Sequence, residues 1–563
     1  MNIMELYENW LEKLPKEDAL RAELLNIKDD IKEITDRFYT GIVFGTAGLR
    51  GKCAAGTNRM NRLTVGRATK GIADYLLSSG EDVSGGVVIA YDCRHYSKEF
   101  SELAASILAG SGIKVYLFPS LRPTPELSFA ITELGCTAGI NMTASHNPKE
   151  YNGYKVYHKD GAQISGEISA GMLREIQKLD FFDDFGIMPL EEAEEKGLVT
   201  WLGEDMDEKF MQYVLSNSKR DRSELDLTIP VVYTPLNGAG SIPVMDMAER
   251  MGFTAFHIVP EQKDPDPDFT TVPYPNPENP KAFALAEKLA KETGAGLIIA
   301  TDPDSDRMAV EISDGKGGFT FLNGNVTGAL IIDYLAESEK ANGTLPHKSA
   351  MIKSIVTGDF GRAICESHGI EVFETLTGFK NICGKIPELE ERGYSYFFGY
   401  EESIGCAPNA KVRDKDGITA AMLITEAAAY LKKQGKSLKN RLEELYKIHG
   451  YFAEGHFSLV LEGKEGRERI LRIMDAFRAG LIKQSTVLDT AQTIDYINGF
   501  GDIPPQNALK YLLSDNAWIA MRPSGTEPKI KFYTDVRTDS AETSAERVKL
   551  ITQELERLID TVE

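Results

Sequence analysis

Cysteine is scarce in this sequence, and its spacing carries no pairing signal. The chain has 6 cysteines in 563 residues, spread singly and without a C-x-x-C pair. A structural zinc site or a disulfide framework needs closely spaced or regularly paired cysteines. We therefore interpret the cysteines as small, buried apolar residues of a protein that works in a reducing cytosol.

Long hydrophobic runs are also missing. No stretch of the sequence approaches the ~20 uncharged apolar residues that are needed to span a bilayer. Residues 1–20 mix acidic and basic side chains and lack the apolar segment of a signal peptide. Their leucine and isoleucine spacing is instead typical of an amphipathic helix. We expect a cytoplasmic protein with no membrane partner.

Positive charge is in the minority. Lysine and arginine number 63 against 85 aspartates and glutamates, which gives a formal net charge of −22. This balance argues against a nucleic-acid partner, whose phosphates need a basic face. A small anionic substrate is still compatible with it, provided that the binding groups form local clusters in an otherwise repelling field.

The length and composition are those of a large soluble protein. Hydrophobic residues make up 42% and charged residues 26% of the chain, a balance typical of globular proteins. At roughly 150 residues per domain, the length predicts about four domains.

A strand–helix–strand pattern occurs three times. Its copies begin at Gly85, Thr228 and Ser349 with the strand-like runs GGVVIAY, TIPVVY and SAMIKSIV, and in each copy a glycine ends the helical run before the second strand. Such βαβ units imply mostly parallel sheets. From about His449 the pattern changes to a charged helix, two strand-like runs and a closing helix, which indicates a smaller α+β domain.

The predicted fold is therefore three similar α/β domains with mixed or parallel sheets, followed by an α+β domain. The first domain, with the N-terminal helices, takes residues 1–205. The later domains take residues 206–322, 323–447 and 448–563.

The first motif with chemical potential is GINMTASHNPKEYNGYKVY, which starts at Gly139. It places Ser145 in a polar turn after an apolar stretch, although an ordinary Ser/Asn/Pro turn would look the same. It is not the G-x-S-x-G elbow of hydrolases, because Thr143 stands where a glycine is required. Adjacency alone does not make His146 a base for Ser145, since neighbours in an extended chain point apart.

The second motif, GLIIATDPDSDRMAVEI, contains three alternating carboxylates between two apolar runs. In an extended loop, Asp302, Asp304 and Asp306 would share one side and converge. Converging carboxylates repel one another unless a cation lies among them, and such oxygen ligands suit Mg²⁺. An EF-hand is excluded because it needs glycine in place of Arg307 and glutamate in place of Ser313.

Two further loops could bind a sugar phosphate. FFGYEESIG ends an apolar run with Glu401 and Ser403, which can hydrogen-bond to sugar hydroxyls, although paired glutamates more often face solvent. MRPSGTEPKIKFY forms a small-residue turn before a strand, whose backbone N–H groups, hydroxyls and arginine suit a phosphate. The residues of this turn are Arg522, Ser524, Gly525 and Thr526.

A glycine-rich loop, FGTAGLRGK, starts at Phe44 and includes Arg50. It is no Walker A motif. The G-K-[ST] triplet of the chain lies at residues 435–437, and Tyr430 stands where the required earlier glycine would be. A P-loop kinase is thereby disfavoured.

Together, these motifs resemble the α-D-phosphohexomutase superfamily, which includes phosphoglucomutases and phosphomannomutases. The resemblance extends from FGTAGLR at residue 44 to RPSGTEPK at residue 522, with four signature loops in the family's order. It implies three similar α/β domains and a fourth domain related to TATA-box-binding-protein-like folds, in agreement with the repeat pattern.

The resemblance also implies roles for individual residues. Ser145 is similar to the family's phosphoserine, which would share one Mg²⁺ with Asp302, Asp304 and Asp306. His146 and Lys155 match positions linked to proton transfer, and Arg50 matches an arginine near the reacting phosphate. The residues that match substrate-binding positions are Arg307, Lys380, Glu401, Ser403, Arg522, Ser524, Gly525 and Thr526.

The implied activity is reversible interconversion of glucose 1-phosphate and glucose 6-phosphate through glucose 1,6-bisphosphate, with small sugar phosphates as partners. The sugar loop reads GYEESIGC and lacks the histidine of phosphomannomutase-type members, and Asn237 stands where many members have histidine. These details resemble the larger phosphoglucomutase branch, which includes phosphopentomutase activity. A phosphopentomutase, a phosphomannomutase and a sugar-phosphate phosphatase remain alternatives.

Overall fold

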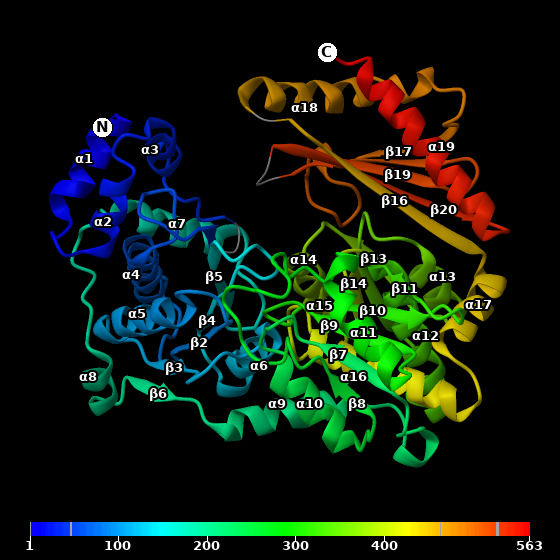
Figure 1. The fold of residues 1–563 in the computed structure, drawn as a ribbon. Coiled ribbons are helices and arrows are strands. Elements are labelled where there is room, and N and C mark those ends of the chain that lie inside the picture. Colours follow the sequence, from blue (N-terminus) through cyan, green and yellow to red (C-terminus); the bar gives the residue numbers. More distant parts are fainter. Residues whose placement is uncertain (1, 46–47, 462, 525–527) are drawn as a thin grey trace. The chain divides into compact units, whose positions relative to one another are not determined.

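The computed structural model describes residues 2–45, 48–461, 463–524 and 528–563 (Figure 1). The chain divides into two compact units. Unit 1 comprises residues 1–321 and 405–430, and unit 2 comprises residues 322–404 and 431–563. The chain thus enters unit 2, returns to unit 1 and enters unit 2 again.

Unit 1 begins with three short helices, α1 (Ile3–Lys13), α2 (Ala19–Asn26) and α3 (Ile31–Phe38). They enclose a small core of their own, in which Trp10 and Phe38 meet edge to face with ring centroids 5.5 Å apart. Asn2 and Glu5 form a capping box at the start of α1, which satisfies backbone donors that the helix leaves open. The amphipathic helix predicted at the N-terminus is confirmed.

The first sheet of unit 1 has the strand order β1-β5-β4-β2-β3-β6. Its parallel strands are β2 (Val87–Tyr91), β3 (Val115–Leu117), β4 (Ala138–Met142) and β6 (Val199–Trp201). Strand β5 (Tyr151–His158) runs antiparallel to its two neighbours, β4 and β1 (Gly48–Lys52). The main helices of this part are α4 (Arg62–Ser78), α5 (Ser97–Gly110), α6 (Thr124–Leu134), α7 (Gly166–Lys178) and α9 (Glu204–Ser216). The β2, β3 and β4 residues are almost all buried, as expected for strands covered on both faces.

The second sheet of unit 1 has the order β11-β10-β9-β7-β8. Strands β7 (Val231–Thr234), β8 (Phe256–Ile258) and β9 (Leu297–Thr301) are parallel, and β10 (Met308–Ser313) runs antiparallel to β9. Helices α10 (Ser241–Met251) and α11 (Ala284–Thr293) connect these strands, and β11 (Phe319–Leu322) lies at the edge. The strand β15 (Gly405–Ala407) and most of α16 (Gly417–Lys433) also belong to unit 1.

Unit 2 contains a parallel arrangement of β13 (Glu371–Thr375), β12 (Ser349–Ser354) and β14 (Ser395–Glu401). The helices beside these strands are α12 (Gly324–Asn342), α13 (Phe360–Ser367), α14 (Phe379–Gly384), α15 (Ile386–Glu391) and α17 (Leu438–His449).

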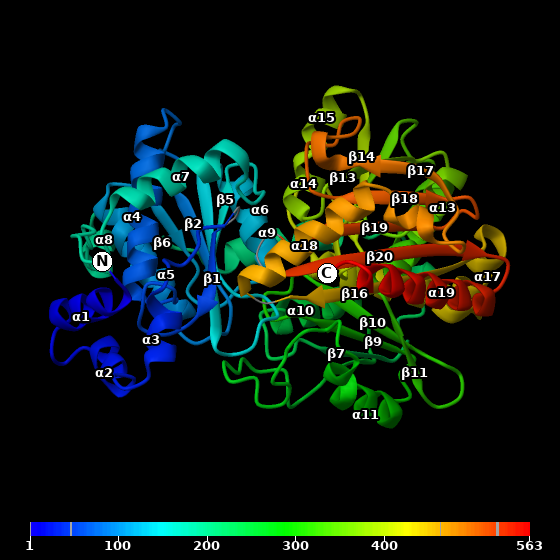
Figure 2. The same cartoon turned by 90° about the horizontal axis from the view of Figure 1, so that it is seen from above.

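The C-terminal part of unit 2 is an antiparallel sheet of order β16-β20-β19-β18-β17. Its strands are β16 (Tyr451–Val460), β17 (Thr490–Asp495), β18 (Leu509–Leu513), β19 (Trp518–Pro523) and β20 (Lys529–Thr538). Helices α18 (Gly463–Arg478) and α19 (Ala541–Asp560) both lie on one face of this sheet (Figures 1 and 2). Apolar side chains from both helices and from the strands form one core.

The predicted fold class is confirmed. The three strand–helix–strand repeats are β2-α5-β3, β7-α10-β8 and β12-α13-β13, and the two strands of each repeat pair in parallel. The predicted domain boundaries stay a prediction, and the compact units group the chain differently, since residues 405–430 belong to unit 1.

None of the helices in the described ranges combines the length and the hydropathy that crossing a bilayer requires.

Two carboxylates face each other in the C-terminal sheet. Glu454 on β16 and Asp535 on β20 are register partners. Asp535 Oδ2 accepts a hydrogen bond of 2.9 Å from the backbone N–H of Asp359, whereas the buried oxygens Asp535 Oδ1 and Glu454 Oε1 have no hydrogen-bond partner among the described residues. Burial, followed by the charges of Glu454 and Asp359, raises the pKa of Asp535 to about 8.

We expect the wild-type protein to lose stability as pH rises to about 8, and we expect Asp535→Asn to remove this loss. The folded protein holds the Asp535 proton up to about pH 8, whereas the pKa of the free side chain is 3.8. The stability contributed is therefore complete below the unfolded pKa and is lost as pH rises through the folded pKa. One pKa unit is worth about 1.4 kcal/mol, so the wild-type free energy of unfolding should fall by at least ~1.4 kcal/mol more than that of the variant between about pH 5 and about pH 9. Urea unfolding at both pH values measures this, and equal pH dependence in the two proteins would contradict it.

Candidate functional site

Ser145 lies in the connection between β4 and β5 of unit 1. Its side chain is buried, and its backbone adopts the left-handed conformation with φ of 51°, which is uncommon outside glycine. The Ser145 N–H donates to Thr143 Oγ1 at 2.8 Å. The hydroxyl donates to Asp302 Oδ2 at 2.6 Å. The turn therefore directs the Ser145 hydroxyl at the acidic loop.

The acidic loop connects β9 to β10 in unit 1. Asp302, Asp304 and Asp306 are buried, and one carboxylate oxygen of each lies within 4.8 Å of the others. The predicted convergence is present, but the loop is not extended as expected. A turn closes it, with Ser305 at φ of 52° and a 2.8 Å hydrogen bond from Ser305 N–H to the Asp302 carbonyl.

Two largely buried lysines balance part of this negative charge. Lys155 Nζ lies 2.8 Å from Asp304 Oδ2 and 3.4 Å from Asp306 Oδ2, and Lys415 Nζ lies 2.9 Å from Asp306 Oδ2. Burial alone would lower the pKa of Lys155, but the charges of Asp304 and Asp306 outweigh it and raise that pKa. Burial, followed by the charges of Asp304 and Asp306, raises the pKa of Asp302 well above its usual value. A third negative charge in this loop is therefore unfavourable unless a further cation is present.

The carboxylates fit a divalent cation. Asp304 Oδ1 and Asp306 Oδ1 are buried and have no hydrogen-bond partner within the described ranges, because the lysines contact the other oxygen of each group. Buried carboxylate oxygens without a partner are costly. Hard oxygen ligands of this kind suit Mg²⁺ or Mn²⁺.

A second group with the composition of a metal site fits less well. Asp333, Glu337 and His368 of unit 2 have potential ligand atoms within 4.8 Å of one another. Arg441, however, donates to both oxygens of Asp333 at 2.7 and 2.8 Å. The charge of Asp333 is therefore already neutralised by a bidentate ion pair with Arg441.

His146 contacts Ser145 directly. Its Nδ1 lies 3.2 Å from Ser145 Oγ, so the left-handed turn brings together two neighbours that an extended chain would separate. Burial, followed by the positive charges of Arg307 and Arg50, holds the pKa of His146 well below its usual value. The neutral imidazole can exchange a proton with the hydroxyl.

The two predicted arginines of unit 1 also lie near this turn. Arg50 on β1 donates from Nη1 to Asn147 Oδ1 at 3.3 Å. Arg307 donates its backbone N–H to Asp302 Oδ1 at 3.0 Å, and its guanidinium lies 3.5 Å from Glu278 Oε2. Unit 1 therefore brings together every site residue predicted between Arg50 and Arg307.

Lys415 was not identified from the sequence. It lies in the segment VRDKDGI before α16, and its neighbour Asp414 accepts hydrogen bonds from Tyr157 at 2.9 Å and Gln163 at 2.7 Å. Asp416 binds the backbone N–H groups of Ile418 and Thr419 at the start of α16. Basic and acidic residues alternate in this segment up to Asp416, which caps α16. This pattern could have indicated Lys415.

The remaining predicted residues lie in unit 2. Glu401 Oε1 accepts a 2.5 Å hydrogen bond from the N–H of Gly378, which links the sugar loop to the segment containing Lys380. Burial lowers the pKa of Lys380. Ser403 follows β14 directly.

The predicted phosphate loop joins β19 to β20. The backbone N–H of Ser524 donates to the Lys529 carbonyl at 2.8 Å. Gly525 and Thr526 lie outside the described residues. Tyr533 on β20 hydrogen-bonds to Arg522, and burial raises the pKa of Tyr533 to about 12.

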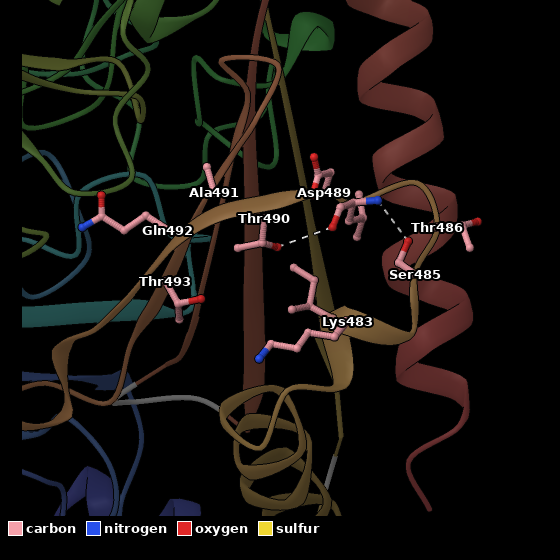
Figure 3. Close-up of a pocket in the computed structure, with 10 residues that line it drawn as sticks. Lys483, Ser485, Thr486, Asp489, Thr490, Ala491, Gln492 and Thr493 are labelled. Carbon is pink, nitrogen blue, oxygen red and sulfur yellow. Dashed lines mark hydrogen bonds between the residues drawn. The ribbon is translucent and has the colours of Figure 1, made fainter.

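A hollow of about 570 Å³ lies elsewhere in unit 2 and is lined by residues of the segment 482–493 (Figure 3). Two of its hydroxyl groups form hydrogen bonds within the segment. Ser485 Oγ accepts from the N–H of Leu488 at 3.1 Å, and Thr490 Oγ1 donates to the Leu488 carbonyl at 3.4 Å. The hollow contains none of the predicted site residues.

The sequence matches four successive domains described as phosphoglucomutase/phosphomannomutase, α/β/α domain I (residues 41–183), domain II (208–315), domain III (323–449) and the C-terminal domain (459–552). A phosphoglucomutase of Staphylococcus epidermidis is 37% identical over 557 residues, covering 96% of this chain and 98% of the relative. A phosphoglucomutase of Staphylococcus aureus (strain USA300) is 36% identical over 553 residues, covering 96% and 97%.

Solved structures share the fold. The phosphoglucomutase pp63/parafusin from Paramecium, in an open form, has a TM-score of 0.68 at 17% identity and covers 92% of this chain and 96% of its own. A phosphoglucomutase/phosphomannomutase family protein from Burkholderia thailandensis has a TM-score of 0.68 at 18% identity, with 92% and 97% covered. The chain belongs to the phosphoglucomutase/phosphomannomutase family of the α-D-phosphohexomutase superfamily and is a phosphohexomutase. The resemblance noted in the sequence is thereby confirmed.

Proposed function

We propose that this phosphohexomutase is a phosphoglucomutase, which interconverts glucose 1-phosphate and glucose 6-phosphate through a phosphorylated Ser145 and glucose 1,6-bisphosphate. The observation that carries the proposal is the buried Ser145 hydroxyl, 2.6 Å from the first of three converging carboxylates. The names of the relatives at 36–37% identity support glucose as the sugar.

The metal that we assign to this site is Mg²⁺, held by Asp302, Asp304, Asp306 and the phosphate of Ser145. When bound, the ion neutralises charge on the phosphoryl group that is being transferred. One oxygen each of Asp304 and Asp306 lacks a hydrogen-bond partner among the described residues, which supports this assignment. Lys155 and Lys415 hold the carboxylates from the other side and limit their repulsion.

Transfer proceeds in two steps. A phosphoryl group passes from Ser145 to the sugar in the first and from the sugar to Ser145 in the second. The sugar hydroxyl attacks the phosphorus of phosphoserine 145, the bond between phosphorus and Ser145 Oγ breaks, the hydroxyl proton passes to a base, and Ser145 Oγ takes up a proton. The bisphosphate then turns over, Ser145 Oγ attacks the phosphorus of the other phosphoryl group, the bond between that phosphorus and the sugar oxygen breaks, and the sugar oxygen takes up a proton. The Ser145 proton passes to one of two acceptors, Asp302 Oδ2 at 2.6 Å or His146 Nδ1 at 3.2 Å. Lys155 and Arg50 supply positive charge and complete the catalytic set.

We further propose substrate-binding roles for the remaining predicted residues. Arg307 would contact the transferring phosphoryl group. Lys380, Glu401 and Ser403 would bind the sugar. The other phosphate would be held by Arg522, Ser524, Gly525 and Thr526, because arginine binds phosphate with two parallel hydrogen bonds.

The test is to supply glucose 1-phosphate, with and without glucose 1,6-bisphosphate, and to follow glucose 6-phosphate and free phosphate together. Glucose 6-phosphate formation stimulated by the bisphosphate is expected. Free phosphate without isomerised product would identify a phosphatase built on the same residues. Faster turnover of mannose 1-phosphate or ribose 1-phosphate would instead favour a phosphomannomutase or a phosphopentomutase.

Lys415→Met is expected to lower kcat by roughly 10- to 100-fold, because Asp306 loses a buried positive charge at 2.9 Å and the acidic loop repels the phosphate more strongly. Lys411→Met is the matched control. Lys411 lies in the same segment, but it is 40% exposed and pairs with Glu133. Steady-state kinetics with both variants measures the effect, and equal kcat values would show that Lys415 has no such role.

A further inference from the structure

Arg94 lies behind the Ser145 turn with a fully buried side chain. Its guanidinium donates to four backbone carbonyls of the connection between β4 and β5. Nη2 donates to the carbonyls of Ser145 (2.5 Å) and Asn147, and Nη1 donates to those of Pro148 (2.9 Å) and Tyr151 (3.1 Å). One side chain therefore ties together both ends of the turn.

Two further groups, the Asp92 carboxylate and the Phe269 ring, contact the guanidinium itself. Asp92 Oδ2 lies 3.2 Å from Arg94 Nε, and Asp92 Oδ1 accepts hydrogen bonds from the Arg94 N–H at 2.9 Å and from Ser97 Oγ at 2.8 Å. The ring of Phe269 lies over the guanidinium, with 5.1 Å between the arginine carbon and the ring centroid. Asp92 and Ser97 flank the junction of β2 and α5, two buried elements of the first sheet. Arg94 is thus held by two buried elements of the first sheet, β2 and α5.

The turn needs such an anchor. Ser145 is held at φ of 51°, a conformation that non-glycine residues adopt only when their surroundings enforce it. This conformation is also the one in which Ser145 Oγ reaches Asp302 Oδ2. Arg94 binds the Ser145 carbonyl directly, so it acts on the backbone that sets the direction of the hydroxyl.

We propose that Arg94 is a positioning residue for phosphoryl transfer. Its planar guanidinium holds the Ser145 turn in place and thereby orients the hydroxyl toward the acidic loop. The inference rests on the proposed function, and it extends that function to a residue whose guanidinium donates to main-chain carbonyls. Lysine cannot replace it, because a single ammonium group lacks the fixed pair of terminal nitrogens that binds carbonyls on two sides.

The variant Arg94→Lys keeps the charge opposite Asp92 and removes the planar guanidinium. We expect kcat to fall by about 100-fold, since small misplacements of a reacting group cost this much, and KM to change by less than about threefold. Hydrogen exchange of the backbone amides in residues 143–151 should rise, whereas exchange in the rest of the first sheet should not.

Arg37→Lys is the matched control. Arg37 is also largely buried and bonds to Glu23, Glu33 and the Ala55 carbonyl at 2.5, 2.7 and 3.3 Å within the N-terminal helices and the segment after β1. It should lose thermal stability to a similar degree but keep kcat and the exchange rates of residues 143–151. If Arg94→Lys does not fold, the double variant Asp92→Asn/Arg94→Gln removes the buried charge pair as a whole, with the same local effect expected.

Unchanged kcat in Arg94→Lys, or a loss of kcat without faster exchange in residues 143–151, would overturn the inference. If the wild-type protein does not isomerise glucose phosphates, the proposed function fails. The exchange measurement then still decides whether Arg94 holds the turn.

Discussion

Ser145→Ala is expected to reduce mutase turnover by at least about 10³-fold, because no other group can carry the phosphoryl group between the two half-reactions. The substitution removes a buried hydroxyl that makes one short hydrogen bond, to Asp302, so its cost in stability should be only about 1 kcal/mol. Coupled formation of glucose 6-phosphate and the thermal unfolding temperature measure the two effects.

Ser101→Ala provides the control for a buried serine. Ser101 lies in α5 and donates to the Ser97 carbonyl at 2.8 Å, within its own helix. Its replacement should leave kcat unchanged. Full activity in Ser145→Ala would exclude the phosphoserine mechanism, and an equal loss of activity in both variants would point to a general defect in folding.

Asp304→Asn is expected to raise the Mg²⁺ concentration for half-maximal activity by about 10- to 100-fold or more, the range seen even for outer-shell changes at metal sites. The substitution keeps the size of the side chain but removes its charge, and Asp304 Oδ1 is one of the two carboxylate oxygens of the acidic loop that have no hydrogen-bond partner among the described residues. The rise in unfolding temperature with added Mg²⁺ or Mn²⁺ should shrink accordingly, which reports binding without reference to activity.

Asp207→Asn is the control for loss of a carboxylate. Asp207 binds Arg122 through two hydrogen bonds of 2.8 Å, and its side chain is 37% exposed. Its magnesium titration should match that of the wild-type protein. A wild-type titration in Asp304→Asn as well would show that the acidic loop is not the metal site.

Much of the fold could be predicted from the sequence because it repeats. Three strand–helix–strand patterns, each with a glycine that ends the helix, specify parallel strands by local rules alone. The acidic motif could be identified for a similar reason, since Asp302, Asp304 and Asp306 are close together in the chain. Their convergence was predicted correctly, although the turn at Ser305 that produces it was not.

The contacts that complete the site could not be read in this way, because they join segments that are distant in the chain. Arg94 and Ser145 are 51 positions apart, and Lys415 approaches Asp306 only because residues 405–430 return to unit 1. The contact between His146 and Ser145 was missed for a different reason. It depends on the left-handed backbone of Ser145, and a serine carries no sequence signal for that conformation.

The most direct test of the central claim is the mass of the peptide that contains residue 145. The protein is incubated with glucose 1,6-bisphosphate and then digested, and the same is done after a chase with excess glucose 1-phosphate or glucose 6-phosphate. The proposed mechanism predicts one added phosphoryl group on Ser145 after the first step and its transfer to the sugar during the chase. A phosphoryl group on another residue, or none on a protein that turns over rapidly, would contradict it.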